Sequence, residues 1–483
     1  MGDHVAVTAM ERDATDVPGP ARRGVDAWVW FAVVVGAIFL AGTARSLADP
    51  DIWWHVRTGR LILDEGIPHS EPWAFTAIGR PWVLTAWLSD VVLALVQDLL
   101  GWRGIVLLKV ALSAALLVTL GRRVFLVANS RLAAPVFVVT VIVLSPFLSE
   151  RPQLVSLVLV VWLAGAVRRL LLEHTLPWWG VAVGYVWANL HGMWVLLPIA
   201  LSVAAAGLAL DRRAGWRAAA ARSLLVAGGT VLVAALTPAG PRLVYWSVVV
   251  RDAAGDVSEW RPTTLTDVYG LAYLALLALW VLAVARGGAR VPRSEVLWML
   301  LVFAFGLVAA RNVAPASVLM APWAAAALHR TFGEALERVR SPLVPIWLAA
   351  ATVAVAAVLT PVRVATQQPI ADGVPLAIVD ELTARPGPVR VLNSYSVGGV
   401  LTGLGAPHVS VAIDGRTDNY SPEFVHRHFL ATTQLFRWRE LLADLDPDVV
   451  VVGQGGQLYD ELTRIGWSTT LVDGDFALLD PPL

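Results

Sequence analysis

Apolar runs recur along the chain from residue 27 to residue 360, separated by short polar segments. A run of about 20 apolar residues is long enough to cross the hydrocarbon core of a bilayer as an α-helix. The pattern predicts an α-helical polytopic membrane protein with about eleven transmembrane helices, which together form a domain at 25–360. The predicted spans are 27–47, 104–121, 131–148, 153–170, 176–190, 193–210, 221–237, 266–286, 294–310, 313–329 and 343–360.

The segment 85–102 differs from these runs. Asp90 and Asp98 are eight positions apart, and Gln97 precedes the second aspartate, so polar groups share one helical face opposite a short apolar stripe. This pattern is typical of a helix that lies in the membrane interface. We therefore expect a long first outer loop at 49–103 that contains this helix.

Arginine placement predicts the orientation, because cytoplasmic loops are richer in Arg and Lys. If 85–102 does not span, fifteen loop arginines lie inside: Arg122, Arg123, Arg131, Arg168, Arg169, Arg212, Arg213, Arg217, Arg222, Arg286, Arg290, Arg293, Arg330, Arg338 and Arg340. Five then lie outside: Arg151, Arg242, Arg251, Arg261 and Arg311. A twelve-span arrangement inverts the ratio. We expect a cytoplasmic N-terminal tail at 1–24, followed by an uncleaved anchor helix.

The region 361–483 has a different pattern. Short strand-like runs, "VRVLNSY", "HVSVAID" and "DVVVVG", alternate with helical stretches at 421–445 and 456–465, and "TTLVDGDFALL" carries a hairpin turn signal. This alternation predicts an α/β domain, and the span count places it on the extracytoplasmic side.

The same topology brings the unusual polar motifs to one face: "DPDIWWH", "SERPQ", "NLHG", "SEWRP" and "ARNV". Asp49 and Asp51 flank a proline at the end of the first span and are the candidate catalytic residues. A partly desolvated carboxylate can have its pKa raised toward the working range of a general base. Capping of the next helix is the alternative role. His55 is a candidate substrate ligand or a packed interfacial histidine.

Two outer arginines oppose the positive-inside trend. Arg151 and Arg311 each carry a guanidinium fork that matches phosphate oxygens, so either is a candidate ligand for a lipid phosphate. The alternative is that they only extend from a helix end toward the interface.

Five further positions are candidates for substrate binding. Asn189 and His191 lie in a tight connection and could bond sugar hydroxyls, or form only a turn. Glu259 lies in a long outer loop and matters only if that loop folds back over Asp51. Asp414 and Arg416 follow a predicted strand, at the edge where open α/β sheets bind ligands.

Composition excludes several classes of protein. Hydrophobic residues make up 57% of the chain and charged residues 15%, with a mean hydropathy of +0.65, which is outside the range of soluble domains. No cysteine is present, so disulfides and thiolate chemistry are excluded. The chain has neither a basic patch for nucleic acid nor a GxxxxGK[ST] phosphate loop.

The acidic motif after the first span, the long outer loop, the many spans and the outer C-terminal domain together resemble the GT-C superfamily of membrane glycosyltransferases, which use polyprenyl-phosphate-linked sugar donors. The chain also resembles a group of bacterial membrane proteins that share the elements found here at 51–55, 151–153, 187–192 and 414–420. This second resemblance adds Gln153 to the candidate substrate-binding residues.

The resemblance implies a glycosyltransferase in a bacterial cytoplasmic membrane. Asp49 or Asp51 would take the place of the catalytic aspartate, and Arg151 or Arg311 would balance the departing lipid phosphate. The partners would be a lipid-linked sugar donor, membrane lipids and a cell-envelope glycan, lipid or protein acceptor. No "WWDYG"-like motif is present, so a peptide acceptor and an obligatory divalent metal are not implied, and the metal and any other cofactor are left open. The alternatives are a lipid-linked glycan transporter, a polymerase-type assembly protein and a membrane scaffold.

Overall fold

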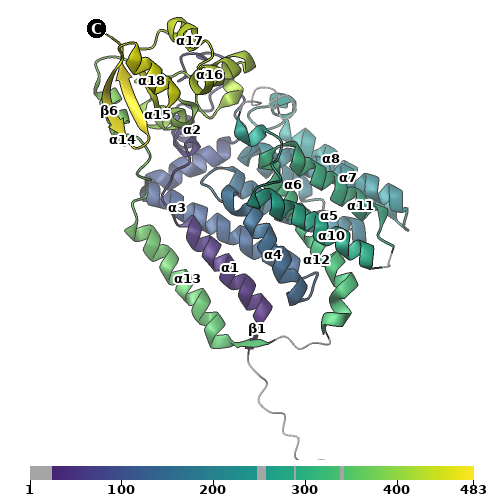
Figure 1. The fold of residues 1–483 in the computed structure, drawn as a ribbon. Coiled ribbons are helices and arrows are strands. Elements are labelled where there is room, and N and C mark those ends of the chain that lie inside the picture. Colours follow the sequence, from purple (N-terminus) through teal and green to yellow (C-terminus); the bar gives the residue numbers. More distant parts are fainter. Residues whose placement is uncertain (1–23, 247–256, 288–289, 338–341, 483) are drawn as a thin grey trace, which may run out of the picture.

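A computed structural model describes residues 24–246, 257–287, 290–337 and 342–482. A bundle of long helices carries a smaller sheet-containing domain at one end, and the two strands of a short N-terminal pairing lie at the other end (Figure 1). That pairing joins β1 (Gly24–Asp26) to β2 (Leu343–Pro345) in antiparallel register. The strand β1 and the sheet domain therefore lie at opposite ends of the bundle.

Helices occupy every predicted span. They are α1 (Ala27–Thr43), α3 (Trp87–Phe125), α4 (Ser130–Leu144), α5 (Gln153–Glu173), α6 (Gly180–Leu190), α7 (Leu196–Asp211), α8 (Trp216–Ala234), α10 (Val268–Arg286), α11 (Arg293–Val308), α12 (Val313–Glu337) and α13 (Ile346–Thr366). Seven helices within the described residues are long and apolar enough to cross a membrane. Two more, α1 and α6, are apolar but shorter. A multi-pass helical protein is confirmed, whereas the count of eleven spans is not.

The bundle packs around α12. This helix contacts α4, α5, α10 and α11, and nearly all of its residues from 313 to 328 are buried. The run Ala324–Ala327 lies in this stretch. Small side chains let helix backbones approach closely, which favours packing where lipid provides no hydrophobic driving force. By contrast, α13 packs beside α1 at the margin of the bundle and exposes most of its apolar residues.

The expected outer loop contains two helical parts. Helix α2 (Asp51–Glu65) follows α1 directly and ends at Gly66, which has a positive φ of 91°. Most of the segment predicted to lie in the interface is helical and forms the first part of α3, which bends at Gly101, where φ is 64° and ψ is −168°. A break of this kind suits glycine, because it lacks a Cβ.

The C-terminal region is an α/β domain, as predicted. Its five-stranded sheet has the order β4-β3-β5-β7-β6. Strands β3 (Val389–Asn393), β4 (Val409–Val411) and β5 (Val449–Gly453) are parallel, and β6 (Ser468–Asp473) and β7 (Phe476–Asp480) form the predicted hairpin. Its helices are α14 (Leu376–Ala384), α15 (Tyr395–Gly405), α16 (Pro422–Gln434), α17 (Trp438–Leu445) and α18 (Gln457–Arg464).

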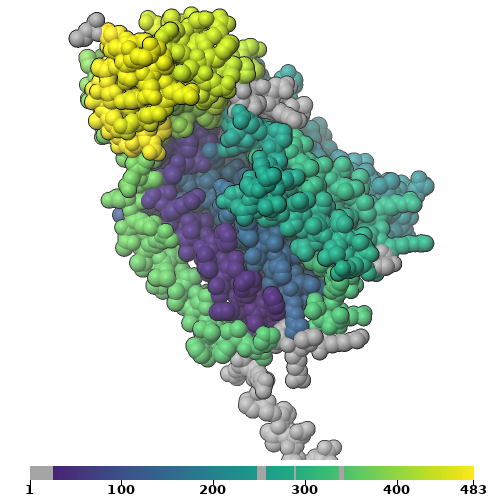
Figure 2. Space-filling model, viewed as in Figure 1, coloured from purple at the N-terminus to yellow at the C-terminus, as the bar shows by residue number. Residues whose placement is uncertain are grey.

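The sheet domain sits closely on the bundle (Figure 2). Its helix α15 packs on α2, and the contact depends on glycines. A Cβ at Gly399 would lie 2.1 Å from the carbonyl oxygen of Pro50, and one at Gly403 would lie 2.4 Å from the carbonyl carbon of Trp53. One apolar core runs continuously from α2 into the sheet. The domain is thus held against the segment that carries the candidate catalytic aspartates.

Candidate functional site

Asp49 and Asp51 lie where α1 gives way to α2. Asp49 Oδ1 accepts from the backbone N–H of Asp51 at 3.0 Å, which is the capping role considered above. The other carboxylate oxygen of Asp49 accepts from Arg151 Nε at 2.6 Å. Asp51 Oδ1 accepts from Trp54 Nε1 at 3.1 Å, so its carboxylate is held toward the same side. Capping therefore does not prevent the two aspartates from forming a site.

Arg151 lies between three carboxylates. Besides Asp49, its Nη1 donates to Glu259 Oε1 at 2.6 Å, and its Nη2 lies 3.3 Å from Asp51 Oδ2. Glu259 thus shares Arg151 with Asp51, which was the condition for Glu259 to matter. We call Asp49, Asp51, Arg151 and Glu259 the Arg151 cluster. Its side chains are partly exposed, from 11% for Asp49 to 38% for Glu259.

The charges of the Arg151 cluster alter its pKa values. Burial lowers the pKa of Arg151, but Asp51, Asp49 and Glu259 outweigh it and leave the pKa raised. Burial raises the pKa of Asp49; the Arg151 charge opposes this and the nearby Asp51 adds to it, with a net increase. A carboxylate with a raised pKa is closer to the range in which a general base exchanges protons.

Glu150 and Lys109 support the turn that carries Asp49. Glu150 Oε1 accepts from the backbone N–H groups of Ala48 and Asp49 at 2.9 and 3.1 Å. Lys109 Nζ lies 3.1 Å from Glu150 Oε2 and donates to the carbonyl of Arg45 at 3.1 Å. Burial raises the pKa of Glu150, but the Lys109 charge and the N–H donors outweigh it, and the net pKa is lowered. The pair keeps the backbone of the turn in place.

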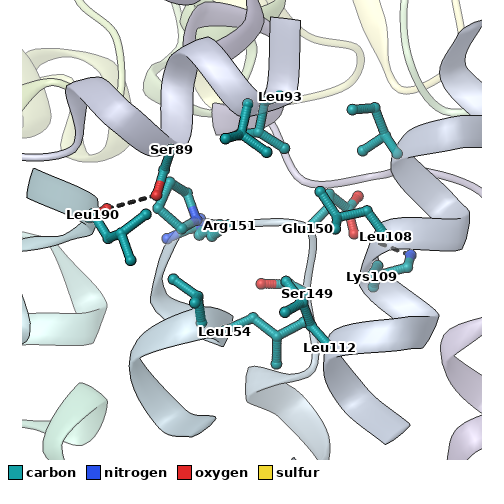
Figure 3. Close-up of a pocket in the computed structure, with 14 residues that line it drawn as sticks. Ser89, Leu93, Leu108, Lys109, Leu112, Ser149, Glu150, Arg151, Leu154 and Leu190 are labelled. Atoms are coloured by element: carbon teal, nitrogen blue, oxygen red, sulfur yellow. Dashed lines mark hydrogen bonds and ion pairs between the residues drawn. The ribbon is translucent and has the colours of Figure 1, made fainter. Parts of the chain in front are cut away.

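A cavity of about 130 Å³ opens beside this pair (Figure 3). Five polar residues contribute to its wall, Ser89 and Arg151 on one side and Lys109 and Glu150 on the other, together with Ser149. The rest of the wall is apolar and comes from α3, from the segment that starts α5 and from the end of α6. These residues are Val92, Leu93, Ile105, Leu108, Leu112, Pro152, Leu154, Val155 and Leu190. The surface that faces the cavity is almost entirely apolar, so the cavity suits an apolar group.

Arg311 is the second outer arginine, and its surroundings differ from those of Arg151. Its guanidinium lies 4.4 Å from the ring centroid of Trp260, a cation–π contact. Burial lowers its pKa, Glu259 raises it and Arg151 lowers it, with a net decrease. Within the described residues it makes no ion pair at the distances of the Arg151 cluster. Its hydrogen-bond donors are therefore available to a ligand.

His191 follows the end of α6. Its Nδ1 accepts from the backbone N–H of Met193 at 3.3 Å and lies 3.0 Å from Ser156 Oγ, which accepts from Trp187 Nε1. A backbone N–H can only donate, so Nδ1 is unprotonated and the neutral ring carries its proton on Nε2. Burial, with Arg311, His55 and Arg151 nearby, lowers the pKa of His191 to about 3. The ring is a neutral donor at ordinary pH.

Of the other predicted ligands, Asn189 and His55 are bonded within the protein, and Gln153 is buried. Asn189 Oδ1 accepts from Trp87 Nε1 at 2.7 Å, and its amide donates to the carbonyl of Tyr185. His55 is buried, with Nδ1 2.6 Å from Asp90 Oδ1. Gln153 is buried at the start of α5. These contacts fix the walls of the site; direct roles in substrate binding stay predictions.

Asp414 and Arg416 lie in a second charged cluster. Arg416 Nε lies 3.1 Å from Asp414 Oδ1, and its Nη1 donates to Glu71 Oε2 at 2.7 Å. Asn419 donates to the same Glu71 oxygen at 2.6 Å. We call Glu71, Asp414, Arg416 and Asn419 the Arg416 cluster. The three charged side chains are at most 1% exposed, so the cluster ties the outer loop to the sheet domain, and the predicted binding role of Asp414 and Arg416 remains untested.

The sheet domain brings two residues to the Arg151 cluster that the sequence did not single out. A Cβ at Gly415 would lie 1.9 Å from Asp51 Oδ1, so this glycine lets the backbone cover the carboxylate. Tyr395 begins α15, and burial together with the charges of Asp51 and Glu259 raises its pKa. The motif "NSYSVGG" follows a predicted strand, which was a signal for Tyr395, but its partners are more than 130 positions away.

Glu150 and Lys109 were also missed as site residues. Lys109 is the chain's single lysine and lies inside a predicted span, and an ionisable group at that depth is usually paired or functional. Glu150 directly precedes Arg151 in "SERPQ". The two signals were present, but only the fold places both beside Asp49.

No protein-family model and no curated protein sequence matches the chain. Solved structures do. An oligosaccharyltransferase from Archaeoglobus fulgidus, tethered with an acceptor peptide, matches with a TM-score of 0.54 and 12% identity over 88% of this chain and 69% of that chain. ArnT from Cupriavidus metallidurans matches with a TM-score of 0.49 in its apo state and 0.46 bound to undecaprenyl phosphate, in both cases at 13% identity over 94% of this chain and 97% of that chain. Both proteins are GT-C membrane glycosyltransferases. The likeness to the oligosaccharyltransferase shows that this chain has their fold.

Proposed function

We propose that the protein is a glycosyltransferase that moves a sugar from a polyprenyl-phosphate-linked donor to an acceptor on the outer face of the bacterial cytoplasmic membrane. One observation carries the proposal. A partly exposed pair of aspartates lies beside an arginine with available donors and an apolar cavity. These are the groups that transfer from a lipid phosphate requires: a base, an anion ligand and a place for the lipid.

Asp51 is the proposed general base. Its carboxylate takes the proton of an acceptor hydroxyl as that oxygen forms a bond to the anomeric carbon of the sugar. The bond from the anomeric carbon to the phosphate oxygen breaks, and the lipid phosphate leaves with the electron pair. Trp54 and Arg151 orient the carboxylate, and Asp49 holds Arg151.

Arg311 is the proposed ligand for the departing phosphate. Arg151 already bonds two carboxylates and lies near a third. The guanidinium of Arg311 instead lies over the ring of Trp260. A bidentate contact between a guanidinium and a phosphate is stronger and more directional than a contact with an ammonium. The Nε2–H of His191 is a neutral donor on the same side and is suited to a sugar hydroxyl.

The cavity is the proposed site for the first part of the lipid. At about 130 Å³ it is smaller than the roughly 300 to 1,000 Å³ of a site for a whole small molecule. It therefore holds the segment next to the phosphate, and the rest of the chain lies in the bilayer. The length of the carrier is left open.

The proposed orientation has the N-terminus inside and the sheet domain outside. Reporter fusions test it directly. A fusion at residue 126, in the connection after α3, is expected to be cytoplasmic, and one at residue 365, at the end of α13, is expected to be extracytoplasmic. A cytoplasmic signal at residue 365 would contradict both the topology and the outer-face site.

The activity is tested by incubating the purified protein with labelled polyprenyl-phosphate sugars and membrane-derived acceptors. Transfer by the parent and its loss in Asp51→Asn would support the proposal. Binding of the donor without transfer in either protein would favour a lipid-linked glycan transporter or assembly protein. The absence of donor binding would favour a scaffold.

A further inference from the structure

We propose that the guanidinium of Arg151 occupies the position between the site carboxylates that a divalent metal ion would otherwise take. The inference rests on the proposed function, because it concerns how the same site balances its charge. Asp49, Asp51 and Glu259 come from two distant parts of the chain and converge on one cation that belongs to the protein itself.

The spacing of the three carboxylates in the Arg151 cluster fits a guanidinium and is too wide for a metal ion. Each of the three nitrogens of Arg151 faces a different carboxylate, at 2.6 Å for Asp49, 2.6 Å for Glu259 and 3.3 Å for Asp51. A delocalised C–N bond adds about 1.3 Å between each nitrogen and the centre of the group. Carboxylate oxygens around Mg²⁺ or Ca²⁺ lie at about 2.0 to 2.6 Å. The carboxylates therefore surround a larger centre than a metal ion provides.

The arrangement of the acidic and imidazole groups also argues against a bound metal ion. Within the described ranges, no group of three or more His, Asp or Glu side chains is placed to hold a metal ion. Asp49 uses both oxygens, one for the backbone N–H of Asp51 and one for Arg151. Asp51 likewise uses one oxygen for Trp54 and faces Arg151 with the other. Metal binding would have to displace these contacts.

Fixing the cation in the protein has a consequence for the reaction. Three carboxylates at one place repel one another unless a positive charge lies between them. Arg151 supplies that charge at every pH at which the protein is folded, because a guanidinium does not lose its proton in proteins. The position of Asp51 then does not depend on the concentration of a divalent ion.

Removing the guanidinium is expected to let the three carboxylates approach one another and so create a metal site that their present spacing does not provide. The experiment titrates full-length detergent-purified protein with Mn²⁺ alone and follows bound Mn²⁺ by electron paramagnetic resonance, with no sugar donor present. Arg151→Met removes the charge while keeping a long side chain, and Arg151→Lys keeps a charge as the matched control. We expect Arg151→Met to bind one Mn²⁺ at least about 10-fold more tightly than the parent, and Arg151→Lys to behave like the parent.

Further variants make the test decisive. Adding Glu259→Gln to Arg151→Met is expected to weaken Mn²⁺ binding again. A parent protein that binds one Mn²⁺, and loses it in Asp49→Asn or Asp51→Asn, would overturn the proposal even if Arg151→Met does not fold. Equal Mn²⁺ affinity in the parent and Arg151→Met would also overturn it. Because no donor is present, these outcomes are independent of whether the protein transfers sugar.

Discussion

The Arg151 cluster and the Arg416 cluster are built from the same groups, an arginine between carboxylates, and differ in what surrounds them. In the Arg416 cluster the charged side chains are at most 1% exposed, and the guanidinium lies 4.8 and 5.0 Å from the ring centroids of Trp73 and Trp82. In the Arg151 cluster the side chains that carry the carboxylates are 11 to 38% exposed to solvent. An apolar cavity also lies beside it.

This difference is the one expected between a structural contact and the proposed reactive site. A buried ion pair is stabilising only when its polar atoms are satisfied, and losing one partner leaves an uncompensated charge. Glu71 accepts from Trp73 and Ala74 with one oxygen and from Arg416 and Asn419 with the other, so this carboxylate is fully bonded and closed to a ligand. In the Arg151 cluster Asp51 and Glu259 retain surface for a ligand. Residue type alone does not distinguish the two clusters.

The largest effect is expected for Asp51→Asn. The two side chains are nearly equal in size but differ in basicity, so we expect turnover to fall by about 100-fold to 10,000-fold while thermal stability changes little. The measurement is transfer from a labelled lipid-linked sugar together with a melting curve. Asp64→Asn, at the exposed end of the same helix, is the control. Full activity in Asp51→Asn and in Asp49→Asn would show that neither aspartate is the base.

Arg416→Met is expected to lower the stability of the protein, in contrast to Asp51→Asn, which is expected to lower turnover. It leaves Glu71 and Asp414 buried without their cation, which typically costs about 3 to 5 kcal/mol. We expect a lower unfolding temperature and faster proteolysis of the sheet domain. The control, Arg427→Met, removes the exposed pair with Asp444 and should cost at most about 1 kcal/mol. Undiminished stability in Arg416→Met, with loss of donor binding, would reassign the Arg416 cluster to the substrate.

Arg311→Lys tests the phosphate ligand. The lysine keeps the charge but loses the fork, and loss of a charge-assisted hydrogen bond is worth about 1.5 to 3 kcal/mol. We expect affinity for a polyprenyl-phosphate sugar to fall by about 10-fold to 150-fold. Arg103→Lys, at an exposed position near the bend in α3, should bind like the parent. Unchanged affinity in Arg311→Lys would return Arg311 to a role at the interface only.

The smallest expected effect concerns Asp418, which accepts from Trp246 Nε1 at 3.2 Å beside the Arg416 cluster. Burial raises its pKa to about 6 from an ordinary value of 3.8. The folded state therefore favours the protonated acid, and this contribution to stability is present below about pH 3.8 and is lost as the pH rises through about 6.

Asp418→Asn keeps an acceptor for Trp246 and removes the titration. We expect the variant to be more stable than the parent at pH 7 and to show a flatter dependence of stability on pH between about 4 and 6. Unfolding by denaturant at several pH values measures this, with the exposed Asp380→Asn as the control. An unchanged pH dependence would mean that Asp418 titrates as it does in the unfolded chain.

The sequence by itself determined the elements of this protein. Apolar runs predicted the helices of the bundle, alternation and turn residues predicted the strands and the hairpin at Gly474, and the break in polarity at Asp49 and Asp51 marked the proposed site. These features depend on residues near one another along the chain, where helical and strand periodicities operate. The GT-C resemblance also came from motifs and their order.

Only the tertiary structure decided which polar groups meet. Arg416 pairs with Glu71 across 345 positions, Arg151 with Glu259 across 108, and Lys109 with Glu150 across 41. No local pattern encodes these distances, because they follow from how helices pack and where the sheet domain sits on α2. Packing also decided burial, and burial is why one arginine cluster is closed while the other remains open to a ligand.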